Sequence, residues 1–261
     1  ASRTRGVFAG GYVSPSPSGR AQIDFVTIAS TGDAADFGDL NNADSVRRAA
    51  VGNATRGLFG GGGNNTQQID YITIASTGDA NDYGDLSVGR SRFSAAGSAV
   101  RGVFAGGFTP TPSNTYFNTI DFVTIATTGD AQDFGDLTKN KTWTASASNS
   151  TRMLISGGDT APGGGGSAVA DIDYITIASG GNATSFGNLN KVVDTGAYAG
   201  AGLASPTRGV FNTGLQKNPN GTYINTIYYV QIATQGQAAD FGDLQEPNYG
   251  CKSCSNAHGG L

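Results

Sequence analysis

The strongest constraint on the fold is a seven-residue block that recurs five times along the chain. Its first copy, Arg5–Gly11, reads RGVFAGG, and further copies stand at 56–62, 101–107, 152–158 and 208–214. The arginines that open these copies are 51, 45, 51 and 56 residues apart. Self-similarity with a period of about 50 residues is typical of propellers and other repeat architectures, in which each repeat is one supersecondary unit.

Each unit contains further blocks beside the opening one. Ile23–Ala29 (IDFVTIA) returns at 69–75, 120–126, 172–178 and 227–233, and Asp36–Leu40 (DFGDL) returns at 82–86, 133–137, 185–189 and 240–244. A segment of small residues stands at 48–52, 93–97, 144–148, 198–202 and 251–255. Runs rich in Val, Ile, Phe, Tyr and Thr between glycine or Ser-Thr-Gly-Asp turns are the pattern of short β-strands. Because no helical period of 3.6 residues is present, the sequence predicts an all-β protein.

Four short strands in each of five units predict one five-bladed β-propeller over residues 1–261. The expected units are 1–44 together with 246–261, then 45–89, 90–140, 141–193 and 194–245. The small-residue segments should lie innermost, where the strands crowd the axis. Since no such segment precedes Arg5, residues 250–256 are expected to pair antiparallel with residues 5–9 and close the ring. The aromatics of the DFGDL block should be buried against the neighbouring blade; they are Phe37, Tyr83, Phe134, Phe186 and Phe241.

The order of the blocks resembles the kelch repeat, in which a hydrophobic run ends in a Gly-Gly doublet and two aromatic-bearing strands follow. Gly10-Gly11, Phe25 and Phe37 occupy these places in the first unit. Phe or Tyr stands where kelch repeats usually have tryptophan, and kelch propellers usually have six or seven blades. The wording of the blocks is most similar to kelch-like repeats in virion structural and tail-fibre proteins of marine tailed phages, and this resemblance covers the whole chain.

Composition argues against two classes of partner. The net charge is −4, the sequence pI is about 4.8, and no cluster of Lys and Arg is larger than Arg47-Arg48. Nucleic-acid binding by neutralisation of phosphates needs a basic patch, so nucleic acid is not expected as a partner. No apolar stretch approaches the roughly 18–20 residues of a membrane helix, so a membrane is not expected either.

The arginines that open the five repeats have two interpretations. They are Arg5, Arg56, Arg101, Arg152 and Arg208. A ring of them would bind an anion, but a charged residue at the same place in every repeat more often makes a structural contact. We expect the structural contact, because a planar guanidinium holds several acceptors at once. The expected acceptor is either the carboxylate before the outer aromatic, such as Asp36, or a backbone carbonyl in the adjoining turn.

Neither a metal nor a cofactor is expected. The Asp-rich turns, such as 33–39, lack the spacing of a calcium loop, and the fourth unit has no carboxylate at the matching positions. Cys251, Cys254 and His258 offer three ligands where a structural zinc site uses four. We expect the two cysteines to fill the inner strand, with their oxidation state left open.

The segments that differ most between units follow the Gly-Gly position, and all should leave the same face of the propeller, here called the loop face. Variable loops on a rigid scaffold are where binding residues concentrate. The alternative interpretation is that these loops are unselected turns or contacts to another subunit. The candidate exposed aromatics on the loop face are Tyr12, Phe108, Tyr116, Phe117 and Tyr223.

These observations predict a binding protein and not an enzyme. The chain has one histidine, and its Asp-rich sites are repeated turns, whereas catalytic sites are usually asymmetric. We expect a virion structural or adhesin-type propeller at the virion surface or outside the cell, which binds a host-surface glycan or a neighbouring virion protein; self-association stays open. One alternative is a secreted multivalent lectin with a sugar pocket between each pair of blades. Another is a carbohydrate-active enzyme of the galactose-oxidase type, whose copper site one histidine cannot supply.

Overall fold

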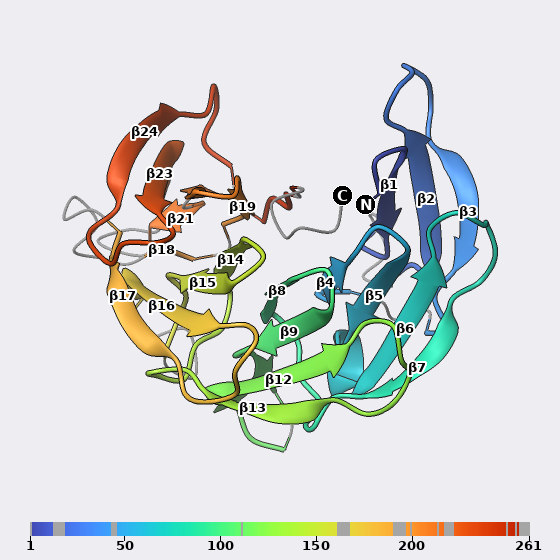
Figure 1. Cartoon of the computed structure of the whole chain (residues 1–261), viewed down its shortest axis with the longest axis horizontal. Helices are drawn as coiled ribbons and strands as arrows, with labels where there is room; N and C mark the ends of the chain where they lie inside the picture. The colour runs from blue at the N-terminus through green and yellow to red at the C-terminus, as the bar shows by residue number, and fades with distance from the viewer. Residues whose placement is uncertain are drawn as a thin grey trace.

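The chain folds into five antiparallel β-sheets arranged around a central axis, which are the blades of a five-bladed β-propeller (Figure 1). The predicted all-β class is thereby confirmed. The one helical element among the described residues is a 3-10 turn, η1 (Gly63–Asn65). The computed structural model describes residues 2–12, 19–42, 46–110, 112–160, 168–189, 197–198, 200–212, 214–216, 222–248, 250–253 and 255.

Blades 2 to 5 each contain four strands that follow one another from the axis outward. Blade 2 consists of β4 (Ala49–Gly52), β5 (Arg56–Gly60), β6 (Gln68–Thr73) and β7 (Asn81–Asp85). Blade 3 consists of β8 (Ser94–Gly97), β9 (Arg101–Ala105), β12 (Thr119–Thr124) and β13 (Gln132–Asp136). Blade 4 consists of β14 (Ala145–Ser148), β15 (Arg152–Ser156), β16 (Asp171–Thr176) and β17 (Thr184–Asn188). Blade 5 consists of β19 (Gly202–Ala204), β20 (Arg208–Asn212), β23 (Thr226–Gln231) and β24 (Ala239–Asp243).

Blade 1 has three strands, and two small sheets lie outside the blades. The strands of blade 1 are β1 (Arg5–Ala9), β2 (Gln22–Thr27) and β3 (Ala35–Asp39). A hairpin is formed by β10 (Phe108–Thr109) and β11 (Thr115–Tyr116). The second small sheet consists of β18 (Ala197–Tyr198), β21 (Leu215–Gln216) and β22 (Thr222–Tyr223).

The glycine of the DFGDL block lets neighbouring blades approach closely. Gly38 in β3 has a φ of +142°, which favours glycine. A Cβ at Gly38 would lie 2.5 Å from the backbone of Gly78, which belongs to a turn of blade 2. The amide of Gly78 also donates to the carbonyl of Phe37 at 2.6 Å. The outer strand of one blade is therefore in direct backbone contact with a turn of the next.

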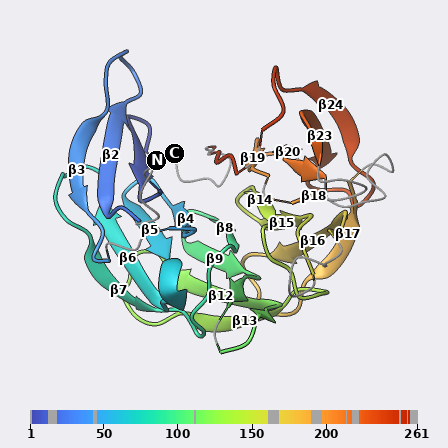
Figure 2. The same ribbon diagram turned by 180° about the vertical axis from the view of Figure 1, so that it is seen from behind.

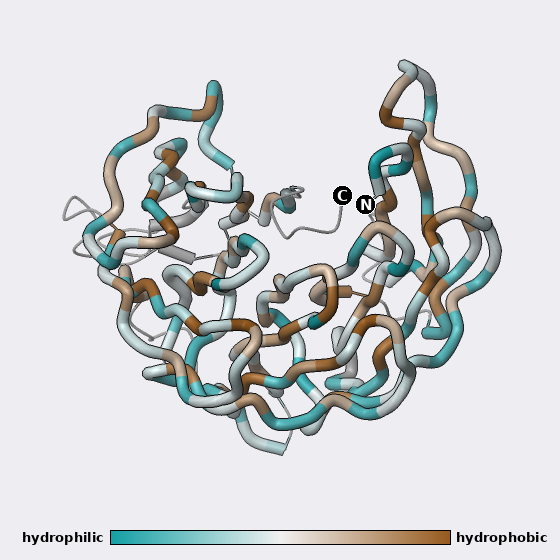
Figure 3. The backbone as a smooth tube through the Cα atoms, in the orientation of Figure 1, coloured by the Kyte–Doolittle hydropathy of each residue, from teal (hydrophilic) through white to brown (hydrophobic). Residues whose placement is uncertain are grey.

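The hydrophobic core is divided among the four junctions between successive blades, since each buried cluster combines residues of two neighbouring blades. Within each blade, an aromatic of the second block meets the outer aromatic edge-on, as Tyr71 meets Tyr83 with centroids 6.0 Å apart. In Figure 3 hydrophobic stretches recur along the strands. The predicted burial of the outer aromatics is confirmed for Phe37, Tyr83, Phe134 and Phe186. It is wrong for Phe241, which is 54% exposed because no blade covers it.

The innermost strands lie side by side around the axis, β4 beside β8, β8 beside β14 and β14 beside β19. Small residues permit this approach, and serine hydroxyls bond across it. Ser148 Oγ donates to the carbonyl of Gly97 at 2.8 Å and accepts from its amide at 3.2 Å. In blade 5 the inner strand is β19 and not the predicted segment 198–202, because Tyr198 belongs to β18, which pairs with β21 instead.

The predicted pairing that closes the ring is not formed. Among the described strands β1 pairs with β2 alone, and residues 250–253 and 255 form no strand. Ser253 Oγ instead donates to the carbonyl of Gly202 at 2.7 Å, and the amide of Ala204 donates to Ser255 Oγ at 3.1 Å. These bonds hold residues 253 and 255 against blade 5, and the described residues include no inner strand for blade 1. Figures 1 and 2 both show blades 1 and 5 at the open side of the propeller.

Candidate functional site

The five candidate aromatics of the loop face do not form one exposed surface. Tyr12 and Tyr223 are exposed, Tyr116 and Phe117 are half-buried, and Phe108 is buried. Phe108 lies in β10, whose pairing with β11 places its ring 5.1 Å from that of Tyr116. The expected exposure is wrong for Phe108 because its loop folds back as a hairpin and covers it.

Residues with positive φ stand just ahead of the inner strands in three successive blades. Arg47, Arg92 and Trp143 have φ values of 57°, 59° and 57°, in the left-handed region that non-glycine residues rarely adopt. The amide of Arg92 donates to the carbonyl of Arg47 at 3.2 Å, and that of Trp143 to the carbonyl of Arg92 at 2.8 Å. These bonds join blades 2, 3 and 4 in a belt around the axis, and strained conformations held in this way concentrate at functional sites.

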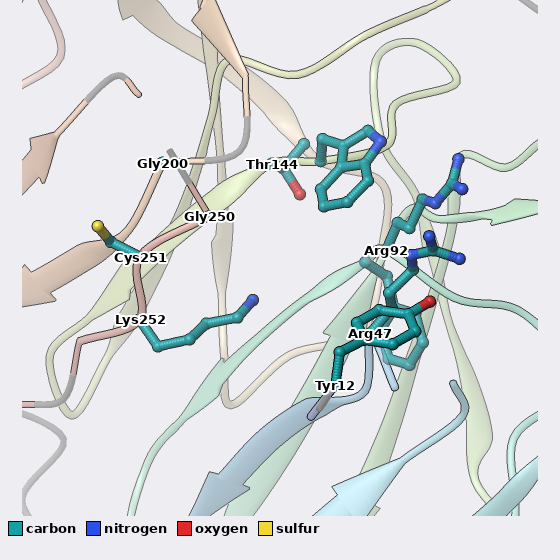
Figure 4. A pocket seen from close by; sticks show the side chains of 10 residues that line it. Tyr12, Arg47, Arg92, Thr144, Gly200, Gly250, Cys251 and Lys252 are labelled. Atoms are coloured by element: carbon teal, nitrogen blue, oxygen red, sulfur yellow. The ribbon is translucent and has the colours of Figure 1, made fainter. Parts of the chain in front are cut away.

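A pocket of about 290 Å³, here called the axial pocket, lies between this belt and the C-terminal segment (Figure 4). Figure 4 shows Lys252 extending across the pocket toward Tyr12 and Arg47, while the thiol of Cys251 points away. The pocket opens at the loop face, because the belt precedes the inner strands and Tyr12 follows the Gly-Gly doublet of blade 1. Its lining consists of Tyr12, Arg47, Arg92, Phe93, Trp143, Thr144, Gly200, Gly250, Cys251 and Lys252.

The lining of the axial pocket is cationic and aromatic. The described residues of the lining include two arginines and one lysine and no Asp or Glu. The guanidinium of Arg47 lies 5.3 Å from the ring centre of Tyr12, and that of Arg92 lies 4.8 Å from Phe108 and 5.0 Å from Trp143. Cation–π contacts of this kind favour one placement of a guanidinium over the face of a ring. Two of the three cations of the lining thus lie against aromatic rings.

Lys252 is an exposed residue of the pocket lining, although its ammonium lies close enough to the surrounding protein to be partly desolvated. Desolvation by the surrounding protein lowers the pKa of its ammonium below the usual range. None of the described lining residues is a carboxylate that would offset that cost. An anion bound beside Lys252 would restore the stability of the charged form, because a nearby opposite charge raises the pKa of a lysine.

Four of the pocket residues were not predicted from the sequence. Arg47, Arg92 and Trp143 each stand immediately before a small-residue segment, and Lys252 lies within one. That shared position was the available signal. This signal was weak because the residue type at that position differs between units. The pattern of repeats therefore does not mark the position as functional.

The repeat-opening arginines are structural and do not line the axial pocket. Arg5 donates to the carbonyl of Ile74 in the next blade at 2.9 Å, and its guanidinium lies 4.6 Å from the ring centre of Phe25. Equivalent bonds run from Arg56 to Ile125 and Ala126, from Arg101 to Ile177, and from Arg152 to Ile232 and Ala233. Of the two expected acceptors, the turn carbonyl is thus the observed one, because each guanidinium reaches across to the next blade.

Buried ion pairs recur in three blades behind the inner strands. In blades 2 to 4 the aspartates of the second block are at most 1% exposed, and each meets a cation of its own blade. The pairs are Arg48–Asp70 at 2.6 Å, Arg90–Asp121 at 3.0 Å and Lys141–Asp173 at 3.0 Å. Burial lowers the pKa of Arg90, and the charge of Asp121 opposes that shift. In blade 5, Tyr228 stands at the position of this aspartate. Each of the three ion pairs therefore joins two residues of the same blade.

The Asp-rich turns form backbone caps. Asp79 and Asp130 accept from outer-strand amides of the preceding blade at 3.0 Å, and Asn182 does the same in the fourth unit. Because a neutral amide replaces the carboxylate there, the geometry needs an acceptor and not a charge. The described part of the chain contains no group of three or more His, Cys, Asp or Glu placed to hold a metal ion.

The predicted cysteine and histidine cluster is described only in part. The thiol of Cys251 donates to the amide oxygen of Asn248 at 2.7 Å. Cys254 and His258 lie outside the described residues. In the described chain, no helix has the length and apolar character needed to cross a membrane.

Comparison with known proteins adds no relative to this description. No protein-family model matches the sequence, and no curated protein matches it.

Proposed function

We propose that this chain is a non-enzymatic binding propeller, a virion structural or adhesin-type component, which holds an anionic group of a host-surface glycan in the axial pocket. The observation that carries the proposal is the lining of that pocket, whose described residues include Arg47, Arg92 and Lys252 and no Asp or Glu. The virion setting is supported by the resemblance of the repeats to those of phage tail-fibre proteins.

A glycan fits this lining better than a simple ion. Tyr12 and Trp143 offer aromatic surface for the apolar face of a sugar ring, and the cations offer partners for a carboxylate or sulfate. A volume of about 290 Å³ lies at the small end of ligand pockets. The pocket therefore suits one acidic sugar residue at the end of a chain.

The described pocket residues also favour binding over catalysis. Its side chains with a nucleophilic atom are Tyr12, Thr144, Cys251 and Lys252. Thr144 Oγ1 bonds to Ser94 Oγ at 3.0 Å and Cys251 bonds to the amide of Asn248, so neither has a general base beside it. General acid–base catalysis requires such a group within hydrogen-bonding reach.

Binding of an acidic sugar should depend on Lys252. The chain has one tryptophan, Trp143, and it lines the pocket, so its fluorescence reports binding directly. We expect glucuronic acid to change this fluorescence and Lys252→Met to weaken binding about tenfold or more. A hydrogen bond to a charged group contributes roughly 1.5–3 kcal/mol, and about 1.4 kcal/mol is a factor of ten. Raising the salt concentration should weaken binding by the wild-type chain through screening.

Lys139→Gln is the matched control, because Lys139 is an exposed cation paired with Asp171 and its loss changes the net charge equally. It should leave the affinity unchanged. Glucose tests the sign of the charge, and equal affinity for glucose and glucuronic acid would contradict the proposal. Titration by calorimetry should give one site per chain, whereas the lectin alternative requires near-equivalent sites between the blades.

A further inference from the structure

The C-terminal segment has the same register against blade 5 as an inner strand has against its neighbour. The amide of Ala204 in β19 donates to Ser255 Oγ at 3.1 Å, and a β8 amide donates to Ser148 Oγ at 3.2 Å. Ser255 thus corresponds to Ser148 in β14. Since Gly250 and Trp143 each stand five residues earlier, they correspond as well. Their φ values of 76° and 57° agree with this, because both lie in the left-handed region.

The walls of the axial pocket differ, although equivalent positions of the repeat form them. The belt position carries Arg47, Arg92 and Trp143 in blades 2 to 4, and Gly250 in the C-terminal segment. Gly200, just ahead of β19, also lines the pocket. Figure 4 shows Gly200 and Gly250 on the opposite side of the pocket from Arg47 and Arg92. The pocket therefore has a wall of cations and rings, and a facing wall, here called the glycine wall, to which Gly200 and Gly250 contribute backbone.

Glycine is not required at position 250. Arg47 and Trp143 carry full side chains at the corresponding position, with a φ of 57° each. A Cβ on Gly250 would meet no described atom within 4 Å. Gly200 differs, because a Cβ there would lie 2.0 Å from the carbonyl oxygen of Asn212. Packing thus accounts for Gly200, whereas Gly250 leaves open a space in the glycine wall that a side chain could occupy.

We propose that a glycan chain leaves the axial pocket over Gly250, so that the pocket binds the acidic residue of an oligosaccharide and Gly250 admits the sugar attached to it. This inference rests on the proposed function. A pocket of about 290 Å³ accommodates one sugar residue, so the attached residue lies outside it. In the described lining, the space in front of Gly250 is a place where no side chain obstructs that residue.

The cations orient the sugar toward this exit. A carboxylate is attracted to the side of the pocket where Arg47 lies and toward which Lys252 extends (Figure 4). In a uronic acid the linkage oxygen and the carboxyl group are attached to different ring carbons. A ring held by its carboxylate at Arg47 and Lys252 therefore leaves the linkage free to point to another side, and the glycine wall is the side that faces the cations.

Two disaccharides of glucuronic acid and glucose test the exit in the wild-type chain by titration calorimetry. One is joined through the anomeric carbon of the uronic acid, and the other through one of its ring hydroxyls. With a single exit, one disaccharide should bind within about threefold of glucuronic acid and the other about tenfold more weakly, because its glucose meets a wall. Equal affinities for the two disaccharides, or weak binding of both beside firm binding of glucuronic acid, would overturn the exit alone. A wild-type chain that does not bind glucuronic acid would instead overturn the proposed function, and the exit with it.

Gly250→Leu tests where the exit lies, and Gly250→Ala is its control, because both place a side chain on the same left-handed backbone. We expect Gly250→Leu to weaken binding of the tighter disaccharide about tenfold or more and to leave the affinity for glucuronic acid within about threefold, because leucine fills the space of the second sugar. Gly250→Ala should bind both ligands nearly as the wild-type chain does, since its Cβ meets no described atom within 4 Å. An unchanged affinity for the disaccharide in Gly250→Leu, or an equal loss for both ligands, would exclude Gly250 as the exit.

Discussion

Lys141→Met should lower the free energy of unfolding by about 3–5 kcal/mol, the cost of leaving a buried charge without its partner. Lys141 is fully buried and Asp173 is 1% exposed, with 3.0 Å between ammonium and carboxylate. After the substitution the carboxylate keeps the hydrogen bond from the hydroxyl of Thr138 at 2.7 Å. Methionine keeps most of the volume of lysine, so the loss reports charge and not a cavity. Urea unfolding followed by circular dichroism measures it.

Two controls separate burial from charge in this measurement. Lys139→Met removes an exposed cation from its pair with Asp171 and should cost less than about 1 kcal/mol. The double variant Lys141→Met with Asp173→Leu should recover most of the lost stability, because apolar pairs often replace buried ion pairs without penalty. A single-variant loss below about 1 kcal/mol would show that the carboxylate gains water or a proton and that the pair is not needed.

Gly84→Ala should lower the free energy of unfolding by roughly 2–6 kcal/mol through two additive causes. Gly84 has a φ of +140°, and forcing a side chain into such a conformation costs about 1–3 kcal/mol. A Cβ there would also lie 2.5 Å from the backbone of Gly129 in the next blade. Relieving that overlap requires the blades to move apart, and overpacking of this kind costs about 1–3 kcal/mol more.

Gly129→Ala isolates the first cause at the same junction. Gly129 has a φ of +149°, but a Cβ on it would meet nothing within 4 Å. This variant should therefore lose about 1–3 kcal/mol, less than Gly84→Ala. Equal losses in the two variants, measured by urea unfolding, would mean that backbone strain alone requires glycine in the outer strand. The close approach of blades would then contribute nothing.

The sequence by itself determined the blade and the way in which blades join. Strands and turns follow from local patterns, and the contact between two blades occurs four times in the described structure with the same residue types. A single position, such as the aromatic at Phe37 or the arginine at Arg5, therefore indicated an interface role before the structure was known. The structure was needed to identify the hydrogen-bond acceptor of the arginine, because the side chain can reach either a carboxylate or a carbonyl from the same position in the sequence.

Tertiary structure alone decided the axial pocket and the open side of the propeller. Arg47 and Arg92 occupy the same place in successive repeats, but Lys252 occupies a different place in its unit. The three meet because the segments that lead into the inner strands converge on the axis. Phe108 was expected on the surface, but its hairpin buries it against Tyr116. The C-terminal segment was expected to pair with β1, but the hydroxyls of Ser253 and Ser255 form hydrogen bonds with the backbone of β19. In each case the position of a side chain depends on which segments, distant in sequence, lie close to its hydroxyl, ring or charge. The pattern of repeats does not contain these distances between segments.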